Sequence, residues 1–128
     1  MSETEKITIN LGLVDLGQID LLVEEAFYAN RTDFIRTAIR NQLASHSDAV
    51  RDTVARRTLV LGLQHFTRAD LEAVRATGER LEIKVLGLAS IADDVGPDLA
   101  DATIAAVHVL GAFRASSAVR RVLADRIR

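Results

Sequence analysis

The side chains best suited to catalysis or metal binding in this chain are three histidines, two adjacent aspartates and two adjacent serines. His46, His65 and His108 lie far apart and the chain has no cysteine, so no metal-ligand spacing is present. Because neighbouring strand residues point to opposite faces, Asp93–Asp94 fits a helix start better than an acid–base pair. Ser116–Ser117 has no base beside it, so Ser116 is predicted as a helix cap. We therefore predict no catalytic site, no metal, no cofactor and no enzyme activity.

Composition narrows the class of protein further. Without cysteine there are no disulfides, which is compatible with a reducing cytoplasm. No apolar run approaches the roughly 20 residues that span a membrane, and "MSETEKITIN" lacks the apolar stretch of a signal peptide. Residues 1–50 carry four Lys/Arg against eight acids, a net charge of −4, whereas residues 51–128 carry +2. We expect a globular, cytoplasmic protein that does not contact membranes.

A short polar row is the first candidate for recognition. "KITINL" alternates strictly, which predicts a strand with one polar face, carrying Lys6, Thr8 and Asn10. The opposite, apolar face carries Ile7, Ile9 and Leu11.

Two amphipathic helices are predicted after this strand. In "VDLGQIDLLVEEAF" apolar residues recur at three and four, and Asp15 is the expected N-cap. "YANRTDF" interrupts that helix, with Asn30 as the N-cap of the next one and Asp33 three residues later. The second helix has an apolar face made of Phe34, Ile35, Ala38, Ile39 and Leu43.

A single strand cannot satisfy its own backbone hydrogen bonds, and two short helices cannot bury its apolar face. The simplest solution is a second copy of the chain. Two such strands, antiparallel across a two-fold axis, form a ribbon that lies on four helices. A two-stranded ribbon fits the major groove of DNA.

The segment "KITINLGLVDLGQIDLLVEEAFYANRTDFIRTAIRNQL" resembles the ribbon-helix-helix family of DNA-binding proteins, the class of the CopG, Arc and methionine repressors. The resemblance covers about residues 4–45 and rests on the alternating strand and on "NRTDFIRTAIRNQL". It implies an intertwined homodimer whose core contains the strand's apolar face and that of the second helix. The turn between the helices lacks the family's usual glycine, so Ala29 or Asn30 is expected to adopt that geometry.

The resemblance also implies DNA contacts. Lys6, Thr8 and Asn10 match the strand positions that read bases; a lysine can donate to guanine and an asparagine can pair with adenine. Asn30, Arg31 and Thr32 match the start of the second helix, where backbone N–H groups grip a phosphate, in agreement with the physics of helix ends. The acidic balance of this segment predicts modest affinity per dimer, because affinity depends on phosphate neutralisation.

The second half of the chain repeats itself. "VLG" occurs three times, at intervals of about 25 residues, each time in a strand–turn–helix pattern. This period predicts a small β/α repeat with parallel strands and helices on one side. Its valines are expected to stack in one column and its glycines in another, near the ends of the strands. These positions are Val60, Gly62, Val85, Gly87, Val109 and Gly111.

Together these patterns predict an α+β protein with three parts. Residues 1–47 form the ribbon-helix-helix domain, residues 48–57 a connecting helix or linker, and residues 58–128 the three-unit β/α repeat. The leading hypothesis is a transcriptional regulator, a repressor that binds double-stranded DNA as a homodimer, with the repeat used for higher assembly or partner binding. Two alternatives stay open: a scaffold or filament protein in which the first domain only dimerises, and an antitoxin.

Overall fold

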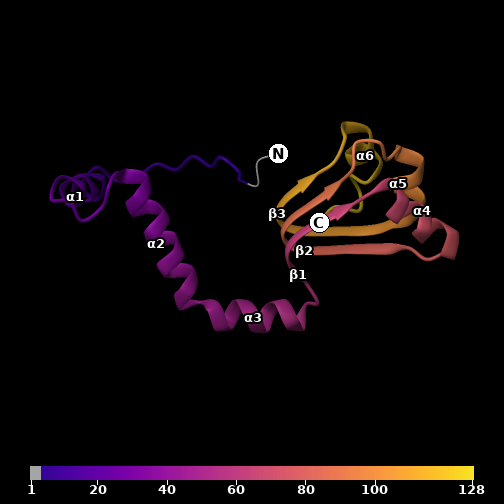
Figure 1. Ribbon diagram of the computed structural model, residues 1–128, viewed down its shortest axis with the longest axis horizontal. Helices are drawn as coiled ribbons and strands as arrows, with labels where there is room; N and C mark the ends of the chain where they lie inside the picture. Colours follow the sequence, from indigo (N-terminus) through magenta and orange to yellow (C-terminus); the bar gives the residue numbers. More distant parts are fainter. Residues whose placement is uncertain (1–3) are drawn as a thin grey trace. The chain divides into compact units, whose positions relative to one another are not determined.

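The structure, a computed structural model, describes residues 4–128 (Figure 1). It contains two compact units, of which the first ends at Thr53 and the second spans Val54–Arg128. Helix α3 (Ser47–Arg56) crosses this boundary. The change from one unit to the other therefore falls within a helix. The predicted first domain begins at residue 1, and residues 1–3 lie outside the described residues.

The first unit contains helices α1 (Leu13–Glu24) and α2 (Arg31–Ser45). The prediction of Asp15 as the N-cap of α1 is wrong: the N-cap is Gly12, which makes no side-chain bond, and Asp15 lies within the first turn. Asp15 still favours this helix end, because its negative charge lies near the positive end of the helix dipole.

The turn after α1 depends on a left-handed residue, Ala26, whose φ is 64°. The N–H groups of Ala26 and of the next residue donate to the carbonyls of Val23 and Leu22, at 3.0 and 2.9 Å. These are the two bonds of a Schellman motif. The prediction that Ala29 or Asn30 takes over the role of the usual glycine is therefore wrong. Alanine here bears backbone strain that glycine would avoid.

Residues 4–12 belong to no helix or strand of the single chain. The predicted strand over residues 6–11 is thus not formed within one copy. The physical reason is that an isolated strand leaves its N–H and C=O groups without partners, and the described part of the first unit contains no other strand. The ribbon stays a prediction about the dimer.

The second unit is built around a parallel sheet with the strand order β1-β2-β3. Its elements after α3 are β1 (Val60–Phe66), α4 (Arg68–Thr77), β2 (Leu81–Ile91), α5 (Pro97–Thr103), β3 (Ile104–Arg114) and α6 (Ser117–Val122). Helices α4, α5 and α6 lie on one side of the sheet (Figure 1). The predicted mixed helix and strand fold with three parallel strands is confirmed.

The repeated tripeptide aligns across the sheet. Val60 pairs with Val85, and Val85 pairs with Val109. The glycines are likewise in register, Gly62 with Gly87 and Gly87 with Gly111. They lie inside the strands, so the expectation that they mark strand ends is wrong.

A core of aliphatic side chains fills the space between the sheet and its helices. The largest fully buried apolar side chains are Leu71, Ile83, Val85, Ile104, Val107, Val119 and Leu123. They come from β2, β3, α4 and the end of α6, so each repeat contributes to one shared core.

The helix ends of this unit follow local sequence rules. Thr67 and Asp70 form a capping box at the start of α4, and Gly78 ends this helix with a φ of 75°. Pro97 occupies the first turn of α5, and the Ser116 hydroxyl accepts a hydrogen bond from the third residue of α6. The Ser116 cap confirms the sequence prediction, and the other three features follow the same kind of local rule.

Candidate nucleic-acid interface

The polar row predicted to read bases is accessible. Lys6, Thr8 and Asn10 are all exposed, in the segment that precedes α1. Within residues 4–128 nothing gathers them into a reading surface, because the segment has no paired strand there to set their orientation. Their arrangement depends on whatever pairs with residues 6–11.

The start of α2, by contrast with residues 6–10, is held by hydrogen bonds of its own side chains. Asn30 is its N-cap, and the Asn30 side chain accepts a hydrogen bond from the Asp33 N–H at 2.8 Å. The Asp33 carboxylate in turn accepts from the Ala29 N–H at 2.9 Å. The N–H groups of Arg31 and Thr32 belong to the first helical turn, in which backbone donors lack acceptors within the helix. This end of α2 therefore combines backbone donors with the positive end of the helix dipole.

The Arg31 side chain is engaged by α1. Its Nε and Nη2 atoms donate to the two carboxylate oxygens of Asp20, at 2.7 and 2.8 Å. The Arg31 guanidinium lowers the pKa of Asp20, chiefly through these hydrogen bonds, and Asp20 raises the pKa of Arg31 for the same reason. The sequence analysis missed this pair, because the residues are eleven positions apart on different helices. Arg31 is thus half of a bidentate ion pair, and the backbone N–H groups at this helix end remain the predicted phosphate contact.

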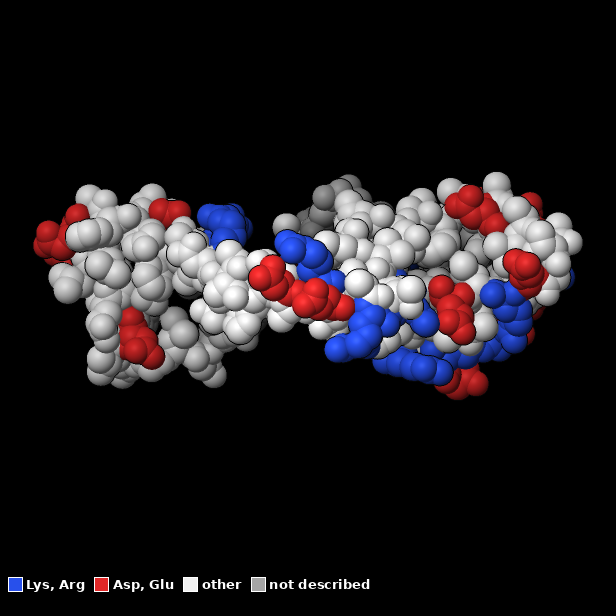
Figure 2. Space-filling model, turned by 90° about the horizontal axis from the view of Figure 1, so that it is seen from below, with Lys and Arg blue, Asp and Glu red and all other residues white. Residues whose placement is uncertain are grey.

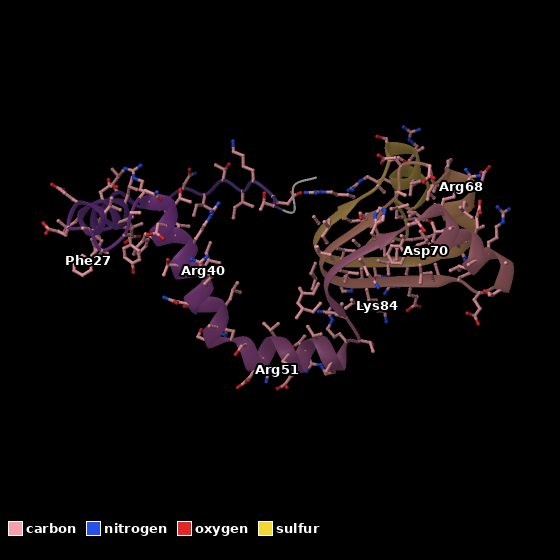
Figure 3. The ribbon with its side chains drawn as sticks, in the orientation of Figure 1. Phe27, Arg40, Arg51, Arg68, Asp70 and Lys84 are labelled. Atoms are coloured by element: carbon pink, nitrogen blue, oxygen red, sulfur yellow. The ribbon has the colours of Figure 1, made fainter. Side chains whose placement is uncertain are left out.

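The first unit exposes most of its apolar residues. The apolar strand positions Ile7, Ile9 and Leu11 are 75%, 58% and 39% exposed. Helix α2 contains no buried residue: Phe34 and Ile35 are half-buried, and Ala38, Ile39 and Leu43 are exposed. In residues 4–53 the buried apolar core consists of Ile19 alone. The turn residue Phe27, 71% exposed, also points away from the helices (Figure 3).

The described part of the first unit therefore has almost no hydrophobic core within one copy. Burying an apolar side chain of this size contributes about 1.5–3 kcal/mol, so leaving this many exposed forfeits most of the stabilisation available to a domain. The apolar residues are the ones predicted for a dimer core, and a second copy would bury them.

Charge is unevenly spread over the molecule. Most of the face of the first unit seen in Figure 2 is uncharged, with acidic side chains in separate places; residues 1–50 carry a net charge of −4. Among the basic residues of α2, Arg40 projects from the side of the helix (Figure 3).

The second unit brings together side chains that the sequence analysis treated separately. His65 Nδ1 lies 2.7 Å from Ser90 Oγ, because residues 65 and 90 are in register on β1 and β2. This pair was missed, although the 25-residue period could have indicated it. Ser90 is only 7% exposed, so its hydroxyl is not presented to a substrate. The pair is a cross-strand hydrogen bond rather than a nucleophile and its base.

The remaining candidates for chemistry are accounted for by local contacts. His108 contacts the Arg57 guanidinium, and His46 lies 3.3 Å from the amide of Gln42. Asp93–Asp94 lies in the turn before α5, so the prediction that it starts a helix is wrong; the acid in the first turn is Asp98. Among residues 4–128, no group of three His, Asp or Glu side chains is placed to hold a metal ion.

One hollow of about 300 Å³ lies between α4 and the start of α5. Its lining alternates in charge, and Arg68 is already paired with Glu72 at 3.0 Å. The hollow is open and small in apolar surface, unlike the enclosed apolar sites that hold small ligands.

Comparison with known protein families identifies the family to which the chain belongs. The model of the ribbon-helix-helix transcriptional regulator family matches residues 2–120, nearly the whole chain, and the chain belongs to this family. It is thereby placed among DNA-binding transcriptional regulators, which usually dimerise and are typically not enzymes. The match extends through the sheet, well beyond the 45 residues that the sequence analysis recognised. Searches of curated proteins and of solved structures find no match. No helix within residues 4–128 is long and apolar enough to cross a membrane.

Proposed function

We propose that this chain is a dimeric repressor that reads the major groove with a two-stranded ribbon built from residues 6–11 of two copies. The observation that carries the proposal is the missing core of the first unit. Ile7, Ile9, Ile39 and Leu43 are between 47% and 75% exposed in one copy, in a family whose members usually dimerise. Antiparallel pairing of the two segments supplies the backbone partners that residues 6–11 lack within the described part of one copy.

Pairing also orients the polar row. When one face of the ribbon packs on the helices, the alternation of a strand turns Lys6, Thr8 and Asn10 outward. Two copies then present six polar side chains to the groove. Lysine donates to the guanine O6 and N7 atoms, and asparagine bonds bidentately to adenine, which together discriminate base pairs.

The start of α2 would anchor the ribbon to the DNA backbone. The N–H groups of Arg31 and Thr32 donate to a phosphate oxygen, and the helix dipole favours the anion. Asp20 holds the Arg31 side chain, so this side chain shapes the helix end while the backbone makes the contact. The acids of this segment oppose phosphate attraction, so binding depends on several dimers along the operator or on the basic second unit. A cytoplasmic location goes with this proposal.

The test is a mobility-shift assay on the DNA upstream of the chain's own gene. Lys6→Ala and Asn10→Ala are each expected to weaken the shift by about tenfold or more, since a good base contact is worth about 1–3 kcal/mol of discrimination. Lys84→Ala is the matched control, because Lys84 is the other lysine of the chain and lies in β2. Equal shifts for wild type and all three variants would remove the base-reading role of the ribbon.

A further inference from the structure

Strand β1 concentrates the exposed apolar surface of the second unit. In residues 54–128 four large apolar side chains are exposed: Val60 at 42%, Leu61 at 68%, Leu63 at 59% and Leu110 at 40%. Three of these four belong to β1, which is an edge strand of the sheet. Exposed apolar edge strands are sites where another strand can add.

The opposite edge of the sheet is partly covered. The Val107 N–H donates to the Arg126 carbonyl and the Arg128 N–H donates to the Val107 carbonyl, both at 2.9 Å, so the end of the chain covers β3 at Val107. Further along, the Arg120 guanidinium donates to the Phe113 carbonyl and lies over the Phe113 ring. These contacts occupy the β3 edge at Val107 and at Phe113, so they obstruct a continuous head-to-tail pairing of β3 with β1 of another copy.

The backbone of β1 has a definite outer side. The Phe66 carbonyl accepts a hydrogen bond from Ala92, directly after β2, so Phe66 directs its groups towards β2. Because strand residues alternate in the direction of their backbone groups, Leu61, Leu63 and His65 direct their N–H and C=O groups outward. Within residues 4–128 no acceptor or donor meets these outward groups.

We propose that β1 pairs with β1 of a second copy, antiparallel, about a two-fold axis at Leu63. In this register Leu63 lies opposite Leu63 of the second copy, and Leu61 lies opposite His65 of the second copy. All three outward-facing residues then exchange both of their backbone hydrogen bonds, as alternate pairs of an antiparallel ladder do. The two three-stranded sheets become one sheet of six strands.

The chemistry of the strand suits its own copy. "VLGLQHF" contains no Lys, Arg, Asp or Glu, so no like charges meet across the axis. The two Leu63 side chains, each 59% exposed in one copy, become direct cross-strand neighbours. A strand that is self-complementary about its central residue fits an isologous contact between identical chains.

The β1–β1 contact is too small to hold two copies together without a second interface elsewhere in the chain. One pair of seven-residue edges buries far less than the about 1,200–2,000 Å² of a stable interface. A second copy that is already held through the first unit raises the effective concentration to the range at which such a contact forms. The strength of the β1–β1 contact thus rests on the proposed dimerisation through the first unit. The register centred on Leu63 follows from β1 alone and does not depend on that dimerisation.

Single cysteines test the register, because the chain has none of its own. Residues that face each other in a hydrogen-bonded antiparallel pair have Cα atoms about 5.5 Å apart, within the about 4.4–6.8 Å of disulfides. Full-length Leu63→Cys is therefore expected to form a disulfide-linked dimer under mild oxidation. Leu61→Cys is the matched control on the same exposed edge. Its two copies would lie about 14 Å apart along the ladder and would stay monomeric on a denaturing gel.

The outcomes separate the two proposals when the variants are also tested for DNA binding. Cross-linking of Leu63→Cys but not of Leu61→Cys supports the pairing, even if no variant shifts DNA, in which case only the proposed function falls. Equal cross-linking of both variants, or no cross-linking by Leu63→Cys, overturns the pairing. If DNA binding persists in either case, the proposed function stands. The second result would point to a strand of another protein as the occupant of this edge.

Discussion

The three aligned glycines make a quantitative prediction about the sheet. A Cβ atom added to Gly87 would lie 2.2 Å from the Gly62 carbonyl oxygen, and one added to Gly111 would lie 2.1 Å from the Gly87 oxygen. A Cβ added to Gly62 would meet nothing within 4 Å, because β1 is the edge strand. All three residues have a positive φ, 124° at Gly62, 137° at Gly87 and 118° at Gly111.

The backbone strain of a positive φ and the steric collision of an added Cβ can therefore be measured separately at Gly62 and Gly87. Alanine in this part of backbone space costs of the order of 1–3 kcal/mol wherever it occurs. At Gly87 the methyl group also displaces a backbone carbonyl of the neighbouring strand, and overpacking of this kind typically costs about 1–3 kcal/mol more. We expect Gly62→Ala to lower the free energy of unfolding by about 1–3 kcal/mol and Gly87→Ala to lower it by about 2–6 kcal/mol.

Urea unfolding of the full chain, followed by circular dichroism, measures the difference. The fluorescence of Tyr28, the single tyrosine, reports the first unit and should follow the same curve in both variants. If Gly87→Ala costs no more than Gly62→Ala, the close approach of the strands is not what excludes a side chain. If Gly62→Ala costs nothing, the positive φ is not a constraint either.

Two further predictions concern local structure. Replacing Ala26 by glycine should raise the urea midpoint of the first unit by the equivalent of about 1 kcal/mol, because the left-handed position then carries no Cβ; Ala29→Gly, outside that position, should bring no such gain. At Asp70, hydrogen bonds from Thr67 lower the pKa of the carboxyl group, so its contribution to stability is present above the ordinary carboxyl range and is lost as the pH falls through the lowered pKa. Urea midpoints measured from neutral to acidic pH should fall less for Asp70→Asn than for wild type, and parallel curves would contradict this role of the capping box.

Local rules accounted for much of the second unit. The caps at Thr67 and Ser116 and the stop at Gly78 depend on residues that are neighbours in sequence, so they could be predicted without the fold. The 25-residue period also predicted parallel strands, because three equal units can bury their apolar faces only by stacking.

Contacts between different helices or strands could not be predicted from neighbouring residues in the sequence. The Arg31–Asp20 ion pair and the His65–Ser90 hydrogen bond each join residues on different elements. Their distances depend on how two helices cross or which strands are neighbours. The turn after α1 was misassigned for a related reason, since Ala26 adopts a conformation that its residue type does not favour.

The sequence alone determined the alternating segment, the two helices after it and the period of the repeat, because strand and helix periodicities are properties of consecutive residues. Only the tertiary structure decided that the repeated glycines lie in mid-strand, with Gly87 and Gly111 each against the carbonyl of the preceding glycine, and that β1 is an open edge while β3 is partly covered. The physical reason is that strand order and close backbone approach are set by how the elements pack together, which no single stretch of sequence specifies.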